Sequence, residues 1–439
     1  NYSLTFYNDS FTYSILNKEE FMLSKDFLDM LDLFSCAARG EIPERRAINV
    51  ESVYQSALSH GVSELVFLSL DSLYKSNSIT IDSALYKMMK MQTLYSISFD
   101  NRSKAVLQAV LQSLHTNGIE CYVLKGYAAA ANYENPDYRI SNDIDLYAGN
   151  QDFDTILSVM AQMGFETQDL RGESHHSIFT RQDVKTIEIH QQLYNILPSR
   201  EYFKNITLSE EFMRIKYSDS FSMNTLGVND GLLFYTYHLM KHFIDCGVGV
   251  RQLMDLLLYV KKYTDSIDWK RYFDKLSDVK FDYFIKTCFR IGIQYLGFTE
   301  DIFNQVDGLY DISDSLAERL LEDFQDSGIY GKGNPHLTNF NRYYLKYRSS
   351  KNTNRETGCM QTKKQLFFPP KELLNKRYSY TVEHPYLLPV AWLHRIFDFT
   401  IALIHKERNI NNYLKKPSAR TANISVKKRL QLLEEMKMI

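Results

Sequence analysis

The sequence predicts an α+β protein in which a mixed sheet with helices is flanked by mostly α-helical N- and C-terminal regions. Apolar residues recur at helical spacing through residues 1–100. They alternate with polar residues in two short segments, 143–147 and 187–190, which is the period of a half-buried strand. Helical spacing then returns and is strongest around 229–245 and 250–263.

Composition limits the class of protein. Of the 439 residues, 44% are hydrophobic and 24% charged, as in a folded chain of two or three domains. A formal net charge of −2 gives no reason to expect a nucleic-acid coat. The 5 scattered cysteines form no CxxC pair, which argues against a disulfide framework or a structural zinc site. No apolar run reaches the roughly 18 residues that span a membrane, and we expect a cytoplasmic protein with reduced thiols.

Four regions follow from these patterns. They are a helical N-terminal region at 1–100, an α/β core at 101–200, a helical domain at 201–348, and a linker with a helical C-terminal extension at 349–439.

The α/β core begins after a long predicted helix. The helical pattern runs through 83–115, and Gly118 stands where a helix commonly ends in a left-handed residue. Residues 120–125 then indicate a strand, which leads through Gly126 into an Ala-rich helix at 127–133.

Three more strands and a helix are predicted within the core. Residues 143–147 form a strand, and Asn150 can cap a helix whose apolar stripe ends before Gly164. Residues 177–180 and 185–190 form two strands joined by a turn.

The remainder is predicted to be mostly helical. After Pro198 the helical pattern continues to about residue 330, and a polar, basic linker follows at 349–364. Residues 389–405 then predict an amphipathic helix, followed by a basic run from Lys406. Such a helix can make peripheral contact with a membrane surface, but a face of this kind more often packs on its own protein or on a partner.

Acidic residues mark the candidate site. Asp143 and Asp145 are two apart in a predicted strand, so their carboxylates lie on one face. Glu188 and His190 share a face of another strand in the same way. Three such carboxylates on adjacent strands can hold one or two Mg²⁺ (or Mn²⁺) ions for phosphoryl or nucleotidyl transfer. The simpler alternative is that Asp143 caps a turn and that Glu188 lies in an exposed edge strand.

Several motifs occur in a fixed order along the chain. They are Leu124-Lys125-Gly126, Tyr133 through Pro136 with Arg139, Asp143-Ile-Asp145-Leu, Ile187-Glu188-Ile189-His190, and Tyr237-His238 with His242, Arg251 and Asp255. This set resembles an uncharacterised bacterial nucleotidyltransferase-like family of the polymerase-β superfold. The resemblance covers roughly residues 80–310 and implies a nucleotidyltransferase fold with a metal site, while it supplies no acceptor.

The chain departs from the wider superfold after its first strand. Most active members have Gly-Ser there, and the Ser and backbone amides hold the terminal phosphates, whereas this chain has Lys125-Gly126. Gly126 would let a phosphate approach the next helix N-terminus, and Lys125 would pair with it as a point charge. An ordinary polar strand end is the alternative for Lys125.

Two further residues near the acidic motifs allow more than one interpretation. Arg139 is a second phosphate clamp or a salt-bridge partner of the acidic cluster. His190 forms a hydrogen bond with the Glu188 carboxylate or contacts the nucleotide. The alternative is an ordinary strand histidine whose hydrogen bonds are made to other groups.

His238 and His242 are four residues apart, so they share a helix face. The resemblance implies that this face lines the nucleotide site together with Arg251, which Asp255 can orient. Plain packing between helices is the alternative, and the sequence offers no third ligand for a zinc site.

The leading hypothesis is a Mg²⁺-dependent nucleotidyltransferase that moves a nucleoside monophosphate from an NTP to an unidentified acceptor. The acceptor would be a hydroxyl or phosphate on a small molecule, a protein or RNA. Asp143 and Asp145 would coordinate the metal that carries the triphosphate, and Glu188 would complete a second-metal position. Two alternatives stay open: a catalytically silent nucleotide- or partner-binding module, and a toxin-like transferase acting on tRNA or protein.

Overall fold

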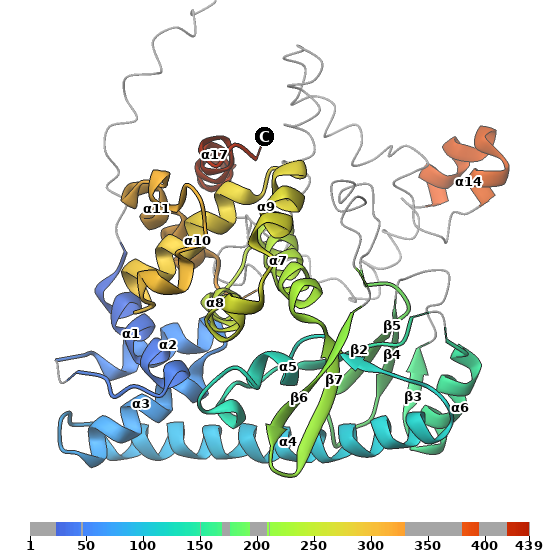
Figure 1. The fold of residues 1–439 in the computed structure, drawn as a ribbon, viewed down its shortest axis with the longest axis horizontal. Helices are drawn as coiled ribbons and strands as arrows, with labels where there is room; N and C mark the ends of the chain where they lie inside the picture. Colours follow the sequence, from blue (N-terminus) through green and yellow to red (C-terminus); the bar gives the residue numbers. More distant parts are fainter. Residues whose placement is uncertain are drawn as a thin grey trace, which may run out of the picture.

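Helices and two β-sheets form the structure, which confirms the predicted α+β class (Figure 1). The computed structural model describes residues 23–44, 47–149, 151–168, 176–193, 209, 211–329, 380–394 and 419–438. Residues 1–22 and the predicted linker at 349–364 lie outside the described residues.

The described N-terminal part is helical, as predicted. Its helices are α1 (Lys25–Arg39), α2 (Val50–His60), α3 (Ser63–Lys75) and α4 (Ser83–Thr116). Helix α4 has 34 residues and is capped at its N-terminus by Asp82, whose side chain accepts from two backbone amides of the first turn. Gly118 follows its end with φ +77°, as its position predicted. Figure 1 shows α4 running beneath both the other helices and the sheet.

A five-stranded sheet forms the α/β core. Its elements in chain order are β1 (Tyr122–Val123), α5 (Tyr127–Ala130), η2 (Pro136–Tyr138), β2 (Asp143–Tyr147), α6 (Phe153–Gln162), β3 (Glu166–Gln168), β4 (His176–Thr180) and β5 (Thr186–His190). The strand order is β1-β2-β5-β4-β3, in which β2 and β5 run parallel and the other pairs antiparallel. The sheet is therefore mixed, as predicted.

One face of this sheet is apolar and covered by helices. Ile144 and Leu146 of β2 and Ile187 and Ile189 of β5 are buried in one core with apolar side chains of α4 and α6. Alternation along the strands therefore turns Asp145 and Glu188 to the opposite face. This burial pattern is what fixes the side of the sheet on which the candidate site lies.

The cap of α6 differs from the prediction. Asp152, and not Asn150, caps this helix, since its carboxylate accepts from the backbone amides of Asp154 at 3.1 Å and Thr155 at 3.4 Å. Asn150 itself lies outside the described residues.

The prediction of a mostly helical chain after Pro198 was wrong for one segment. An antiparallel hairpin, β6 (Phe212–Ser218) and β7 (Phe221–Leu226), forms the second sheet. Ile215 and Tyr217 are buried and alternate with exposed charged residues, so the strand period is present in the sequence.

The helical prediction holds beyond the hairpin, including the segments 229–245 and 250–263. The elements are α7 (Val228–Asp245), α8 (Val250–Tyr263), η4 (Thr264–Ser266), α9 (Trp269–Asp278), α10 (Asp282–Tyr295), η5 (Glu300–Phe303), η6 (Leu309–Asp311) and α11 (Asp314–Ser327). The buried apolar residues of α1–α3 pack in one core with those of α7–α11 and of α17 (Ala419–Glu435). The described N-terminal helices and the helices that follow the hairpin thus share one hydrophobic core.

The C-terminal helix α17 docks on α11 through a buried arginine. Arg429 is fully buried and donates to both carboxylate oxygens of Asp323, at 2.8 and 2.6 Å, and to Ser327. Upstream lie α14 (Tyr380–Glu383) and η10 (Pro385–Leu387). Residues 388–394 are helical where the amphipathic helix was predicted, and the rest of that helix lies outside the described residues.

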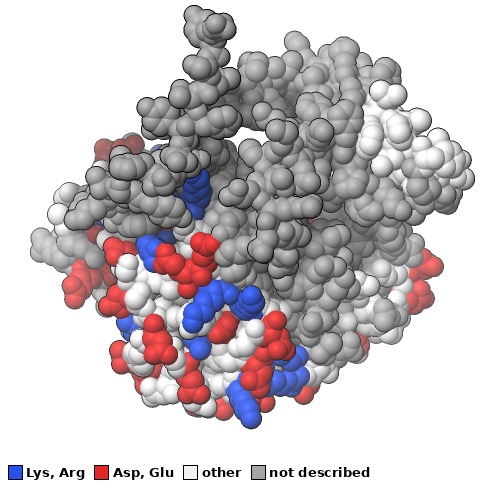
Figure 2. All heavy atoms as spheres, turned by 90° about the horizontal axis from the view of Figure 1, so that it is seen from above, with Lys and Arg blue, Asp and Glu red and all other residues white. Residues whose placement is uncertain are grey.

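Of the helices that the structure describes, none combines the length and apolar character needed to cross a bilayer. On the face shown in Figure 2, the Lys and Arg side chains of the described residues are interspersed with Asp and Glu. The described part of that face therefore offers no continuous basic area of the kind that binds nucleic acid.

Candidate functional site

The candidate site is built on the parallel pair β2 and β5. Asp145 is the register partner of Glu188, and Tyr147 that of His190. Asp143 lies two residues before Asp145 on the same strand face. The structure therefore brings the acidic residues of the two motifs onto neighbouring strands and onto one face, as the spacing predicted.

Three side chains converge on this face. Asp145, Glu188 and His190 each offer a ligand atom, and these atoms all lie within 4.8 Å of one another. His190 Nε2 is 3.1 Å from Asp145 Oδ1 and 3.8 Å from Glu188 Oε2, so its closer contact is with Asp145. The two carboxylates are donors that Mg²⁺ and Mn²⁺ prefer, and the imidazole is a donor that transition-metal ions accept. The residues present thus fit a metal site.

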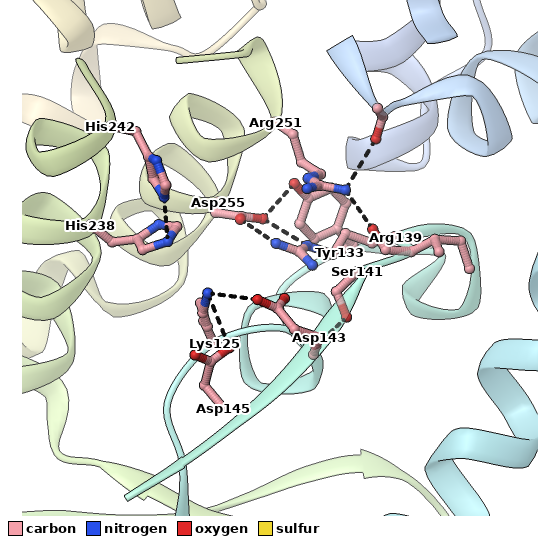
Figure 3. Close-up of polar contacts among 12 residues, drawn as sticks. Lys125, Tyr133, Arg139, Ser141, Asp143, Asp145, His238, His242, Arg251 and Asp255 are labelled. Atoms are coloured by element: carbon pink, nitrogen blue, oxygen red, sulfur yellow. Dashed lines mark hydrogen bonds and ion pairs between the residues drawn. The ribbon is translucent and has the colours of Figure 1, made fainter. Parts of the chain in front are cut away.

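Lys125 approaches the same carboxylates. Its ammonium lies 3.0 Å from Asp145 Oδ2 and 3.3 Å from Asp143 Oδ2, between the two aspartates in Figure 3. The backbone holds it there, since the amide of Leu124 donates to the carbonyl of Asp145 at 3.0 Å. Lys125 therefore supplies a positive charge to the acidic pair.

The surroundings of Asp145 and Glu188 shift the pKa values of these two carboxyl groups in opposite directions. Burial raises the pKa of Asp145, but the Lys125 ammonium and the hydrogen bond from His190 hold it well below the usual range. Burial and the negative charges of Asp145 and Asp143 raise the pKa of Glu188. Asp145 thus stabilises the fold at pH values above 3.8, and this contribution is lost as the pH falls through its lowered folded pKa.

Ionisation of Glu188 has the opposite effect on the stability of the fold, which gives a testable pH dependence. Because its folded pKa is raised above 4.5, the ionised form destabilises the fold at neutral pH, and stability is regained as the pH falls toward 4.5. We expect Glu188→Gln to raise the melting temperature of the metal-free protein at pH 7.5 by about 1–2 °C, and not at pH 4.5. Thermal melts in EDTA at both pH values measure this, with Glu166→Gln on the exposed surface of β3 as the control. An equal shift at both pH values would contradict the assignment.

Gly126 forms the turn next to Lys125, whose ammonium lies beside Asp143 and Asp145. Its φ is +62°, and a Cβ there would lie 3.3 Å from Ser141 Oγ. The Ser141 hydroxyl donates to the carbonyl of Asp143 at 3.0 Å, so the Gly126 turn lies against the start of β2. The helix that follows, α5, has only four residues and is shorter than the predicted 127–133.

We expect Gly126→Ala to destabilise the fold by about 2 kcal/mol and to weaken divalent-cation binding, because it strains the backbone and presses on Ser141. Gly118→Ala is a matched control, since Gly118 also has a positive φ but nothing lies within 4 Å of an added Cβ. Urea unfolding and a Mn²⁺ titration measure the two effects. Equal cation affinity in both variants would show that the Gly126 turn does not position the site.

Of the two interpretations of Arg139, the salt bridge with the acidic cluster was wrong. Its guanidinium is buried and forms a two-pronged ion pair with Asp255 of α8, at 3.0 and 2.5 Å, and not with the Asp143–Asp145 cluster. Tyr133 donates to the same carboxylate at 2.8 Å. Asp255, which spacing had suggested as a partner for Arg251, is thus the partner of Arg139.

Arg251 joins three parts of the chain. It donates to the carbonyl of Ile140, just before β2, at 2.7 Å, and to that of Gly61, between α2 and α3, at 3.3 Å (Figure 3). The segment leading into Asp143 is therefore held by two buried arginine side chains and by helix α8.

His238 and His242 lie on one face of α7, as their spacing predicted. Their Nε2 atoms are 3.1 Å apart, so one ring donates to the other, and Figure 3 shows the pair facing Lys125. Burial, and then the charges of His242 and Lys125, lower the pKa of His238 well below its usual value. His238 is therefore a neutral side chain at neutral pH. Among the described residues, no third metal-ligating side chain joins this pair.

Sequence reasoning missed a buried polar network that joins α4 and α5 to the segments that precede β2 and β5. Lys185, just before β5, forms an ion pair with Asp100 of α4 and donates to Ser141 Oγ at 3.3 Å. Tyr127 donates to the same oxygen of Asp100, at 3.3 Å. The signal was present, because Asp100 and Ser103 fall at buried positions of the α4 stripe, where polar side chains need partners.

A comparison with protein families gives one match. The family model described as "Uncharacterised nucleotidyltransferase" matches residues 46–291, which is more than half of the chain and includes every candidate site residue. Neither the comparison with curated proteins nor that with solved structures gives a significant match.

Proposed function

We propose that this chain, which belongs to the uncharacterised nucleotidyltransferase family, transfers a nucleoside monophosphate from an NTP to an acceptor hydroxyl or phosphate, with release of pyrophosphate and with the help of a divalent cation. The observation that carries the proposal is the convergence of Asp145, Glu188 and His190 on the face of the sheet opposite its apolar core. When bound, Mg²⁺ or Mn²⁺ would stabilise the charge that develops on the transferred phosphoryl group.

Several side chains of the sheet would each have a separate role at this site. Asp145, Glu188 and His190 would hold the cation, with Asp143 beside them on β2. Lys125 would pair with the phosphates as a point charge, and Gly126 sets the turn that delivers it.

The helical domain would contribute in two ways. His238 and His242 would offer hydrogen-bonding groups to the nucleotide, because they face Lys125 across the site. Arg139 and Arg251 would act by holding the segment that precedes β2, since their guanidinium groups are engaged with Asp255 and with backbone carbonyls.

The cytoplasm would be the place of action. None of the four described cysteines forms a disulfide, and NTPs are available there.

Titration of ATP, GTP, CTP and UTP with Mg²⁺ into the protein, followed by calorimetry, tests the proposal. We expect the wild type to bind at least one nucleotide, and an Asp143→Ala/Asp145→Ala variant to lose this binding. An Asp183→Ala/Asp219→Ala variant removes the same charge from partly and fully exposed side chains and should bind as the wild type does. No binding with either Mg²⁺ or Mn²⁺ would contradict the proposal.

An acceptor screen with α-labelled nucleotide then tests transfer. Label on a small molecule, protein or RNA identifies the acceptor, and its loss in Asp145→Ala assigns the chemistry to this site. Metal-dependent binding without transfer to any acceptor would instead favour a silent nucleotide-binding module.

A further inference from the structure

Lys125 occupies the place between the aspartates at which a cation is needed. The two oxygens of Asp145 have different partners: Oδ1 faces His190 at 3.1 Å, and Oδ2 faces Lys125 at 3.0 Å. The side chain of Lys125 is 18% exposed, that of Asp143 28% and that of Asp145 4%. The side chain of Lys125 is thus partly exposed, while the carboxylate of Asp145 with which it pairs is buried.

A buried carboxylate in this position always needs a positive partner. Asp145 lies beside Asp143 and Glu188, and leaving it ionised without a cation would carry a large desolvation and repulsion cost. Loss of Lys125 from Asp145 is therefore tolerated when another cation replaces it.

The Lys125 ammonium and a divalent cation would share the carboxylate of Asp145. A coordinated Mg²⁺ or Mn²⁺ lies about 2 Å from its carboxylate oxygen. With the ammonium 3.0 Å from Oδ2 of the same carboxylate, the two positive charges would be close enough to repel each other. Each cation therefore weakens the binding of the other.

We propose that Lys125 is an internal counter-cation that competes with the divalent cation for Asp143 and Asp145 and is released to the phosphates of the nucleotide. This rests on the proposed function and deepens it. The cation alone binds weakly because it must displace Lys125, whereas the cation–nucleotide complex brings both a replacement charge and a new partner for the ammonium. Binding of cation and nucleotide is then positively coupled, and the coupling acts equally in both directions.

The variant Lys125→Met separates this role from a structural one, because two affinities change in opposite directions. Without nucleotide, Mn²⁺ should bind Lys125→Met about tenfold more tightly than the wild type, because the competing charge is gone. The Mg²⁺ complex of whichever nucleotide binds in the titration of ATP, GTP, CTP and UTP should bind the variant about tenfold more weakly, because a phosphate partner is gone. Calorimetry measures both affinities.

Two other variants serve as controls. Lys216→Met removes the same charge from the exposed hairpin, where Lys216 pairs with Asp219, and both affinities should stay unchanged. Lys125→Arg keeps a cation beside the aspartates, and Mn²⁺ should bind it as weakly as it binds the wild type. Because Lys125→Arg retains the charge, it also tests the proposal if Lys125→Met does not fold.

The outcomes are distinguishable. Equal or weaker Mn²⁺ binding by Lys125→Met, with binding lost in Asp145→Asn, would overturn the competition and leave the metal site standing. Tighter Mn²⁺ binding with unchanged nucleotide affinity would overturn the release to phosphate. Absence of Mn²⁺ binding in every variant and in the wild type would remove the metal site of the proposed function, and the competition with it.

Discussion

Replacing Asp145 by Asn should weaken Mn²⁺ binding by about 100-fold and reduce nucleotide transfer by about 1000-fold or more. The reason is its position, because Asp145 contacts both His190 and Lys125 and is the register partner of Glu188. Its near-complete burial also keeps water from replacing the lost ligand. Mn²⁺ titration and a transfer assay with labelled nucleotide measure the two effects.

Asp143→Asn is the matched control for this prediction. Asp143 shares the strand face of Asp145 but does not belong to the group of converging ligand atoms, and its side chain is 28% exposed. We therefore expect a smaller loss, about tenfold in Mn²⁺ affinity. Equal losses in the two variants would show that both aspartates coordinate directly, as the sequence spacing alone would suggest. Full cation binding by Asp145→Asn would rule out the site.

Removing one partner of the Arg139–Asp255 pair should destabilise the fold by about 3–5 kcal/mol, because it leaves a buried charge without its counter-charge. The two side chains are only 6% and 8% exposed, and Tyr133 also depends on Asp255. Urea unfolding of Asp255→Asn and of Arg139→Met measures the effect. Asp219→Asn, which breaks an exposed pair with Lys216, should cost less than about 1 kcal/mol.

A double variant separates pairing from other effects. If the two residues act as a pair, Arg139→Met/Asp255→Asn should be destabilised by much less than the sum of the single variants. Additive losses would mean that each side chain acts through other contacts. Because Arg139 lies four residues before Asp143, we also expect Arg139→Met to weaken Mn²⁺ binding, whereas Asp219→Asn should not.

Local periodicity was sufficient to predict the elements that carry the site. In β2 and β5 a buried apolar face alternates with a polar face, and this alternation is strong because α4 and α6 cover only one side of the sheet. The hairpin β6–β7 has the same alternation but was missed, because the surrounding sequence is helical and charged residues interrupt the apolar pattern.

The partners of the charged residues could not be predicted in the same way. Arg139 and Asp255 are 116 residues apart, and Lys185 and Asp100 are 85 apart. Nothing in the local sequence specifies such pairs, since an arginine near an aspartate cluster is equally compatible with a phosphate or with the cluster itself. The packing of α8 against the segment before β2 brings Asp255 next to Arg139, and this determines the pair.

The sequence by itself determined the α+β class, the strands with Asp143, Asp145 and Glu188 on a common face, and the helix face of His238 and His242. These depend on spacing along a strand or a helix, which the backbone geometry sets locally. Only the tertiary structure decided that His190 contacts Asp145, that Lys125 bridges the aspartates and that Arg139 belongs to Asp255. Those choices depend on strand register and on helix docking, where burial forces each charge to find its partner among residues that are distant in the chain.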